Sequence, residues 1–187
     1  MKIVHISDTH NFHRDLSPLP KGDILVHTGD CTMAGTDNEA IGFLDWFCDQ
    51  PFGHKIFIAG NHDCCFYKMT GVEGLPNNIH YLCNSGITLE GINFYGIPLF
   101  MQDVAMGLYD RMLLSIPAET DVLLTHQSPF LDETLTNRII EIKPMATLFG
   151  HEHEGYGTSN IGETILSNGA IVDERYIVTN KPNVITI

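Results

Sequence analysis

The stretch KIVHISDTH, residues 2–10, places Asp8 and His10 directly after a run of apolar and β-branched residues. The same arrangement returns in ILVHTGD, KIFIAGNHD, DVLLTH and ATLFGHEH, which begin at residues 24, 55, 121 and 146. Such runs predict strands over residues 2–7, 24–28, 55–59, 121–125 and 146–149. In open α/β sheets, ligands gather beyond the carboxyl ends of the strands. We therefore expect the five polar motifs to meet at one edge of the fold.

The segments between these motifs complete the fold prediction. Thr36 and Glu39 have the spacing of a capping box, which marks the start of a helix. Helices are expected over residues 36–50, 131–142 and 104–114, and β structure over residues 80–97 and 164–187. Helices that alternate with two β-rich parts predict an α/β fold with two packed sheets and helices outside them. No linker or repeat divides the chain, so we expect a single domain over residues 1–187.

The composition limits the classes of protein. A chain of 187 residues that is 43% apolar can bury a sizeable core. Its 23 acidic residues outnumber 10 basic ones, which argues against a large nucleic-acid footprint but not against a small anionic substrate. Neither a signal peptide nor a membrane span is evident, and the five cysteines show no CxxC spacing. We expect a cytoplasmic protein with reduced thiols and no membrane partner; the pattern does not indicate an oligomeric state.

The five motifs differ in how much each one indicates. An Asp-x-His triplet such as Asp8-Thr9-His10 arises by chance in roughly one of every few chains of this length. The GNHD motif at residues 60–63 is expected only about once in a thousand such chains. The GHEH motif at residues 150–153 holds two imidazoles that a strand end could direct at neighbouring metals. A lone His126 would carry little meaning, but in this order the motifs support one another.

The residue types predict a site for two divalent metal ions. Carboxylate, amide and imidazole groups suit manganese, iron, zinc, nickel or cobalt, with manganese favoured. Two such ions roughly 3.5–4 Å apart can clamp a phosphoryl group and generate hydroxide for in-line attack. Asp30 fits the bridging position, and Asn61 fits a weaker, neutral one. His62 is expected to act as a general acid or to stabilise the charge on the leaving oxygen.

These motifs resemble those of the calcineurin-like metallophosphoesterases over nearly the whole chain. LVHTGDCT, KIFIAGNHD, FYGIP and GHEHEGYG are similar to the MPPED-type branch of that superfamily. The resemblance implies a four-layer αββα sandwich with a dinuclear site at one edge. It assigns the first metal to Asp8, His10, Asp30 and His153. It assigns the second metal to Asp30, Asn61, His126 and His151, with His62 as the catalytic histidine that binds no metal.

The chain departs from the family pattern beside the site. Asn11 stands where a glycine is common, and its side chain either contacts the substrate, as Asn61 and His62 are expected to do, or fills the turn. Gln127-Ser128 replaces a common Gly-Pro pair, in a loop that shapes the substrate pocket in related proteins. Residues with open roles near the motifs are His13, Arg14, Asp63 and Tyr156. Two further histidines, His5 and His27, are expected to be packed inside strands.

Three functions remain open on the sequence alone. The first is a phosphodiesterase that acts on small phosphodiesters or nucleotides, including cyclic nucleotides. The second is a phosphomonoesterase or protein phosphatase. Dianionic monoesters usually require additional Arg or Lys in the pocket, and only Arg14 of the four arginines is close to a motif. The third is a metal-binding scaffold without catalysis, which the complete ligand set disfavours.

Overall fold

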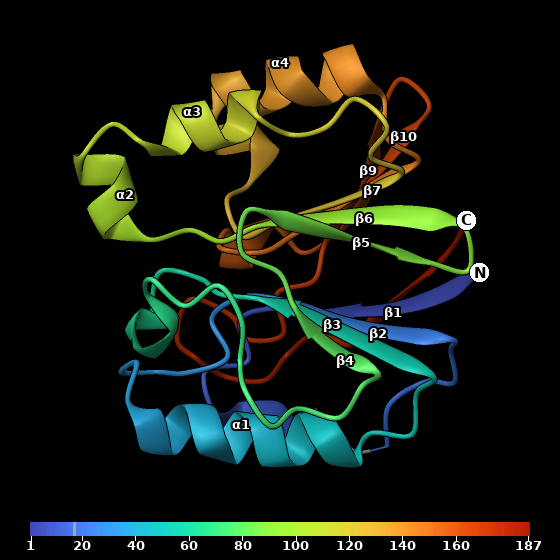
Figure 1. Ribbon diagram of the computed structural model, residues 1–187. Coiled ribbons are helices and arrows are strands. Elements are labelled where there is room, and N and C mark those ends of the chain that lie inside the picture. Colours follow the sequence, from blue (N-terminus) through green and yellow to red (C-terminus); the bar gives the residue numbers. More distant parts are fainter. Residues whose placement is uncertain (17) are drawn as a thin grey trace.

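The computed structural model describes residues 1–16 and 18–187 and contains two β-sheets that face each other (Figure 1). The first sheet has the order β11-β1-β2-β3-β4, with β1 Lys2–Ile6, β2 Ile24–Thr28, β3 His54–Ile58, β4 Ile79–Tyr81 and β11 Asn183–Thr186. The second has the order β5-β6-β7-β8-β10-β9, with β5 Ser85–Leu89, β6 Ile92–Ile97, β7 Val122–Thr125, β8 Ala146–Phe149, β9 Gly157–Ile161 and β10 Thr164–Asn168. Both sheets are mixed: the first has one antiparallel edge strand, β11, and the second has two, β5 and β9.

Helices cover the outer face of each sheet (Figure 1). Helix α1 packs on the first sheet, and helices α3 and α4 pack on the second. Their bounds are α1 Asp37–Asp49, α2 Met101–Ala105, α3 Tyr109–Leu114 and α4 Glu133–Ile142, and 3₁₀ turns span Phe12–Leu16, Cys64–Phe66, Pro129–Leu131 and His153–Gly155. The predicted αββα sandwich is therefore confirmed.

Strand periodicity explains the three apolar layers. Successive side chains of a strand point to opposite faces, so Ile3 packs between the sheets while Val4 packs towards α1. In the second sheet, Leu124 faces the layer between the sheets and Leu123 faces α3 and α4. Every one of these side chains is fully buried. The central strands are therefore apolar on both faces, which is why they read as continuous apolar runs rather than alternating ones.

Two of the expected helices form much as predicted. Thr36 caps α1 and makes the capping box with Glu39. Helix α4 begins after Asp132, whose side chain accepts a hydrogen bond from the backbone N–H of Leu135. Its last residue, Ile142, is followed by Lys143, which adopts a left-handed conformation (φ 55) just before Pro144. The prediction began this helix too early, because residues 129–131 form a separate 3₁₀ turn.

The third expected helix, residues 104–114, is wrong as a single element. The chain instead forms two short helices, α2 and α3, with Gly107 between them at φ 66. Glycine adopts this left-handed conformation without steric cost, so it ends one helix and redirects the chain into the next. The apolar pattern is continuous through this point and gives no sign of the break.

The parallel strands set the position of the motifs. Strands β1, β2 and β3 run parallel to one another, as do β6, β7, β8 and β10. Their carboxyl ends therefore lie at a common edge, termed the carboxyl edge below, and their starts lie at the opposite, amino edge. Among the residues described, no helix is both long and apolar enough to cross a lipid bilayer.

Candidate metal centre

The backbone turns sharply where the strands meet the motifs. Asp8, His10, Asp30 and His151 all have positive φ, between 40 and 67. Left-handed backbone is uncommon for residues other than glycine and persists only where surrounding contacts enforce it. Here those contacts are hydrogen bonds between neighbouring strand ends, such as Asp8 N–H to Gly29 O at 2.9 Å and His10 N–H to Asp30 O at 3.0 Å. Strained backbone is therefore concentrated at the site and held by the sheet.

Two glycines allow the strand ends to approach the carboxylates. A Cβ atom on Gly60 would lie 2.2 Å from Asp30 Oδ1, and one on Gly150 would lie 2.2 Å from Asp8 Oδ2. Contacts this short are impossible for any residue with a side chain. The glycines of GNHD and GHEH are thus required by packing against the two aspartates, a reason that the motif spacing alone does not reveal.

Two buried carboxylates form the centre of the site. Asp8 is 0% exposed and Asp30 is 2% exposed. The backbone N–H of His151 donates to both oxygens of Asp8, at 3.1 and 3.0 Å. The backbone N–H of His62 donates to Asp30 Oδ1 at 2.8 Å. Each aspartate is therefore fixed by the backbone of another motif, and the motifs hold one another in position.

Backbone carbonyls orient four of the imidazoles. Each of these histidines makes a hydrogen bond through Nδ1 to a main-chain oxygen: His10 to Thr32 at 3.1 Å, His62 to Met33 at 2.8 Å, His126 to Thr28 at 2.8 Å and His153 to Asp173 at 3.1 Å. A carbonyl oxygen can only accept, so the proton must be on Nδ1. The lone pair of each neutral ring is therefore on Nε2, which is the arrangement of a metal-binding histidine.

The Nε2 atoms approach the two carboxylates. His153 Nε2 lies 3.4 Å from Asp8 Oδ1, and His10 Nε2 lies 3.7 Å from Asp30 Oδ2. His126 Nε2 lies 3.4 Å from Asp30 Oδ2 and 3.9 Å from Asp8 Oδ1. His10 Nε2 is buried and has no hydrogen-bond partner, an uncommon condition for a buried polar atom that a bound cation would resolve.

Three sets of side chains have donor atoms within 4.8 Å of one another, as a metal ion requires. These sets are Asp8 with His10 and His153, Asp30 with His10 and His62, and Asp8 with Asp30 and His126. Asn61 lies beside them, because its Oδ1 is 3.1 Å from His126 Nε2. The His151 ring is 5.2 Å from the His126 ring, between centroids. All eight predicted ligand and catalytic residues thus lie in one cluster.

The electrostatics of this cluster require positive charge. Burial alone would lower the pKa of His126, but Asp30 and Asp8 raise it to about 10. Burial would likewise raise the pKa of Asp30, yet the charge of His126 and the hydrogen bonds from His126 and from the His62 backbone hold it well below its usual range. Two buried carboxylates side by side need a cation between them. A proton on His126 supplies one, and a divalent ion would supply more.

A polar cavity of about 360 Å³ opens above the cluster. Its lining residues are Asp30, Asn61, His62, His151, Glu152, His153, Glu154, Glu174 and Tyr176. Of these, Glu152, Glu154, Glu174 and Tyr176 were not predicted as site residues from the sequence. The ring of Tyr176 lies 4.9 Å from that of His10 and 5.7 Å from that of His153. Tyr176 follows the last motif by more than twenty residues, in a tail that reads only as short strands and turns, so no local signal marked it.

Asn11 does not line this cavity. Its side-chain amide donates to Glu39 Oε1 at 2.6 Å, next to the capping box at the start of α1. The residue has φ 71, a conformation that asparagine tolerates better than most residues. In this structure the side chain therefore fills a turn and ties it to α1, the second of the two roles expected for it.

The residues with open roles do not line the cavity. Asp63 accepts from the backbone N–H groups of Gly60 and Thr32, both at 2.9 Å, and so ties two motif loops together. His13 is buried against Phe43 and Trp46, and Arg14 donates to a carbonyl of α1. Tyr156 donates to the Lys181 carbonyl. His5 and His27 are fully buried and hydrogen-bonded, as expected for packed residues.

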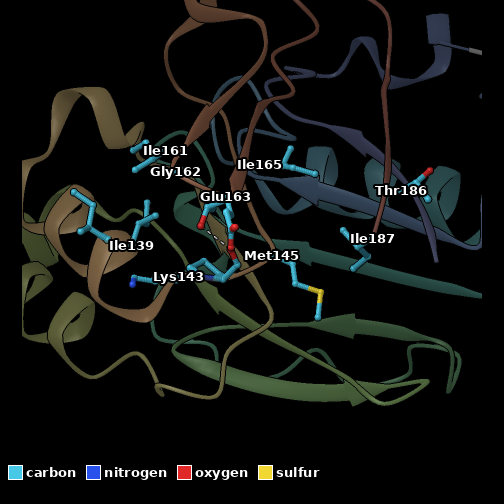
Figure 2. Close-up of a pocket in the computed structure, with 12 residues that line it drawn as sticks. Ile139, Lys143, Met145, Ile161, Gly162, Glu163, Ile165, Thr186 and Ile187 are labelled. Carbon is cyan, nitrogen blue, oxygen red and sulfur yellow. Dashed lines mark hydrogen bonds between the residues drawn. The ribbon is translucent and has the colours of Figure 1, made fainter.

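A different hollow, about 650 Å³ in volume, lies at the amino edge (Figure 2). It is lined mainly by apolar side chains from α4, from the turn between β9 and β10, and from the chain end, including Ile139, Met145, Ile161, Ile165 and Ile187. Lys143 and Glu163 are the charged residues of its described lining. It lacks the grouped carboxylates and imidazoles that hydrolysis would use, so the candidate site is the smaller cavity at the carboxyl edge.

The family follows from sequence comparison as well as from this geometry. The model of the calcineurin-like phosphoesterases matches residues 1–155. The chain belongs to this family of hydrolases that act on phosphate esters. Within the family it falls in the MPPED-type branch, as its relatives show.

Two relatives illustrate that branch. Human metallophosphoesterase domain-containing protein 1 is 30% identical, over all of this chain and 71% of its own length. A UPF0046 protein of Caenorhabditis elegans is 31% identical over 94% of this chain and 76% of its own. Among solved structures, GAP50, the anchor in the inner membrane complex of Plasmodium, superposes with a TM-score of 0.59 at 10% identity and covers 91% of this chain and 71% of its own. At that identity the likeness shows the fold alone.

Proposed function

We propose that the chain is a dinuclear metal-dependent phosphodiesterase that acts on small phosphodiesters, with cyclic nucleotides among the candidates. The observation that carries the proposal is the set of four histidines whose Nδ1 atoms are bound to backbone carbonyls, beside two buried carboxylates. Two divalent ions, with manganese favoured, would activate water there and neutralise the phosphoryl oxygens. The orphaned Nε2 of His10 and the mixed donor set fit such ions.

The proposed ligand sets are those that the family resemblance implies, and some of the distances support them. Asp8, His10, Asp30 and His153 would hold the first metal. Asp30, Asn61, His126 and His151 would hold the second, with Asp30 shared between the two. The grouping of Asp8, His10 and His153 within 4.8 Å supports the first set, and the 3.1 Å approach of Asn61 to His126 supports the second.

His62 has a different proposed role. It lines the cavity, whereas His126 and His10 lie beneath it with at most 1% exposure. The bond from its Nδ1 to the Met33 carbonyl directs the ring and leaves Nε2 as the atom that can exchange a proton with a substrate. We assign it to protonating the leaving oxygen or stabilising the charge there, with Asn61 contacting the phosphoryl group.

The test of this assignment separates chemistry from metal binding. Replacing His62 by alanine should lower kcat by about 10²- to 10⁴-fold, the usual contribution of a general acid, while two metals per chain remain. Metal content is measured by elemental analysis of the same sample that is assayed. A matched control is His80→Ala, since His80 lies on β4 away from the site. Loss of a metal ion from the His62 variant would make His62 a ligand and overturn the assignment.

The charge of the cavity favours diesters over monoesters. Its described lining contains several carboxylates but neither lysine nor arginine, the residues that usually neutralise the second charge of a monoester. Rates on bis-p-nitrophenyl phosphate and p-nitrophenyl phosphate test this preference directly. A higher kcat/KM for the monoester would replace the proposal by a phosphomonoesterase or protein phosphatase. A metal-loaded protein that hydrolyses neither ester would indicate a scaffold.

A further inference from the structure

The cavity wall above the metal centre is acidic. Beyond the proposed ligands and His62, the lining residues are Glu152, Glu154, Glu174 and Tyr176. Glu152 accepts a hydrogen bond from Ser128 at 2.8 Å, so it is partly satisfied within the protein. Glu154 and Glu174 are exposed. Among the residues that the structure describes, the only ion pair that involves a lysine or arginine joins Arg138 to Glu141, both on α4. Among the residues described, the wall carboxylates therefore have no lysine or arginine as an ion-pair partner.

Tyr176 lines the same cavity as these carboxylates. It has φ 58, a strained conformation for a tyrosine, and the turn that imposes it is held by Asp173. The Asp173 side chain accepts from the backbone N–H of Arg175 at 2.9 Å and of Ile177 at 3.0 Å, and its carbonyl accepts from Tyr176 N–H at 2.9 Å. The same carbonyl orients His153. One turn therefore positions a metal-site histidine and an aromatic ring together.

The formal charges around a bound substrate are unequal. Two divalent ions would carry four positive charges, two more than the negative charges of Asp8 and Asp30. A phosphodiester monoanion and an attacking hydroxide would cancel this excess of two. The wall carboxylates would then remain uncompensated, and Tyr176, which is 37% exposed, lines the cavity with them. Carboxylates and an aromatic face together attract cations, quaternary ammonium groups above all. Arg175 does not compensate them within the cavity, since it is absent from the lining.

We propose that the cavity selects zwitterionic phosphodiesters, in which one alcohol carries a quaternary ammonium group. The phosphate would lie at the metal centre, and the ammonium would lie against Tyr176, Glu154 and Glu174. A cavity of about 360 Å³ suits a substrate of headgroup size. This inference rests on the proposed phosphodiesterase function and adds the substrate class to it.

The decisive experiment compares two esters of equal shape. p-Nitrophenyl phosphocholine carries the cation, and p-nitrophenyl 3,3-dimethylbutyl phosphate replaces its nitrogen by carbon and is otherwise matched. Wild-type protein loaded with manganese should show a kcat/KM about 10-fold higher for the choline ester, as expected of a cation held by an aromatic ring and partly solvated carboxylates. The ratio should fall towards one in Glu154→Gln/Glu174→Gln and in Tyr176→Leu. Activity on the neutral ester should stay near wild type in the double glutamine variant.

A binding measurement makes the inference independent of turnover. Tetramethylammonium should give saturation-transfer NMR signals with the zinc-loaded, diamagnetic protein, and the neutral probe tert-butanol should not. The double glutamine variant should lose the signal, whereas Glu163→Gln, at the amino-edge hollow, should retain it. Hydrolysis of both esters at equal rates without tetramethylammonium binding overturns this inference and leaves the phosphodiesterase proposal intact. Tetramethylammonium binding without hydrolysis of either ester would overturn the phosphodiesterase proposal and leave the cation-binding role of the cavity wall intact.

Discussion

The two edges of the paired sheets differ in almost every property, although the same strands build both. At the carboxyl edge the backbone is strained at residues such as Asp8 and Asp30, and these strand ends lie beneath a polar cavity of about 360 Å³. At the amino edge an apolar hollow of about 650 Å³ is lined by isoleucines such as Ile139 and Ile165. The strands supply a rigid apolar middle, and the residues just beyond their ends decide which edge carries chemistry.

This contrast separates stability from function in the molecule. The side chains between the sheets and under the helices are fully buried and apolar, so they account for stability through the area they remove from water. The carboxyl edge instead holds buried charges, which favour folding only when they are compensated. Substitutions at one edge should therefore change activity, and substitutions at the other should change stability alone.

The largest expected effect is that of Asp30→Asn. An amide cannot supply the carboxylate that the two metals are proposed to share, so kcat/KM should fall by on the order of 10³-fold, equivalent to ~4 kcal/mol of transition-state stabilisation. Metal content should fall in parallel, and elemental analysis with a diester assay measures both. The matched charge-neutralising control at the amino edge is Glu163→Gln, for which neither quantity should change. Equal losses in the two variants would remove the functional distinction between the edges.

The next largest effect on activity is expected from Gly60→Ala. Its Cβ would meet Asp30 Oδ1 at 2.2 Å, so either the carboxylate or the strand end must move. A displacement of about 1 Å at a catalytic centre lowers activity by about 10²-fold. The control is Gly42→Ala in α1, where a Cβ meets nothing within 4 Å and should stabilise the helix by about 0.5–1 kcal/mol. Full activity of the Gly60 variant would show that the close approach is unimportant.

The charge of His126 predicts a proton exchange on metal binding. Its pKa in the folded chain, about 10, is raised above the ordinary value, so the ion pair with Asp30 stabilises the metal-free fold fully below about pH 6.5. This stabilisation is lost as pH rises through the folded pKa, at up to ~1.4 kcal/mol per pH unit. An imidazole binds a metal ion only when it is neutral, so metal uptake by the proposed ligand His126 at pH 7 should release about one proton per chain.

Two measurements check this prediction. Calorimetric titration with manganese in buffers of different ionisation enthalpy counts the protons released. Urea unfolding of the metal-free protein between pH 6.5 and 10 follows the loss of stability, and His126→Gln should flatten that dependence. Metal uptake without proton release would mean that His126 is already neutral.

The smallest effect is expected from Ile139→Val at the amino edge. Ile139 is fully buried between α4 and the second sheet and also borders the hollow. Loss of one methylene should cost about 0.5–1.5 kcal/mol of stability. The unfolding midpoint in urea should fall while kcat/KM stays at the wild-type value. A change in kcat/KM would show that packing at this edge reaches the metal centre.

The sequence predicted the sandwich and the clustered motifs for one physical reason. Apolar runs that end in metal-binding residue types are local patterns, and parallel strands place their ends together without further information. The capping box of Thr36 and Glu39 is also local, and it set the start of α1 correctly. The break at Gly107 was missed because the apolar pattern continues through it.

The parts of the site that the sequence did not reveal depend on distant backbone. The Asp173 carbonyl that orients His153 belongs to a residue type with no bearing on that role. Tyr176 reaches the cavity only because its turn folds back beside the ring of His10. Contacts between a side chain and a remote main-chain atom leave no spacing signature, so pattern analysis cannot find them.

The use of main-chain oxygens to orient the imidazoles has an evolutionary consequence. Thr28, Thr32, Met33 and Asp173 contribute their carbonyls to these bonds. A carbonyl is present whatever the side chain, so mutation at these positions leaves the supporting bond available as long as the backbone path is kept. Sequence can therefore drift around the histidines without loss of their orientation, and new side chains can be tried at the cavity wall while the metal centre stays intact.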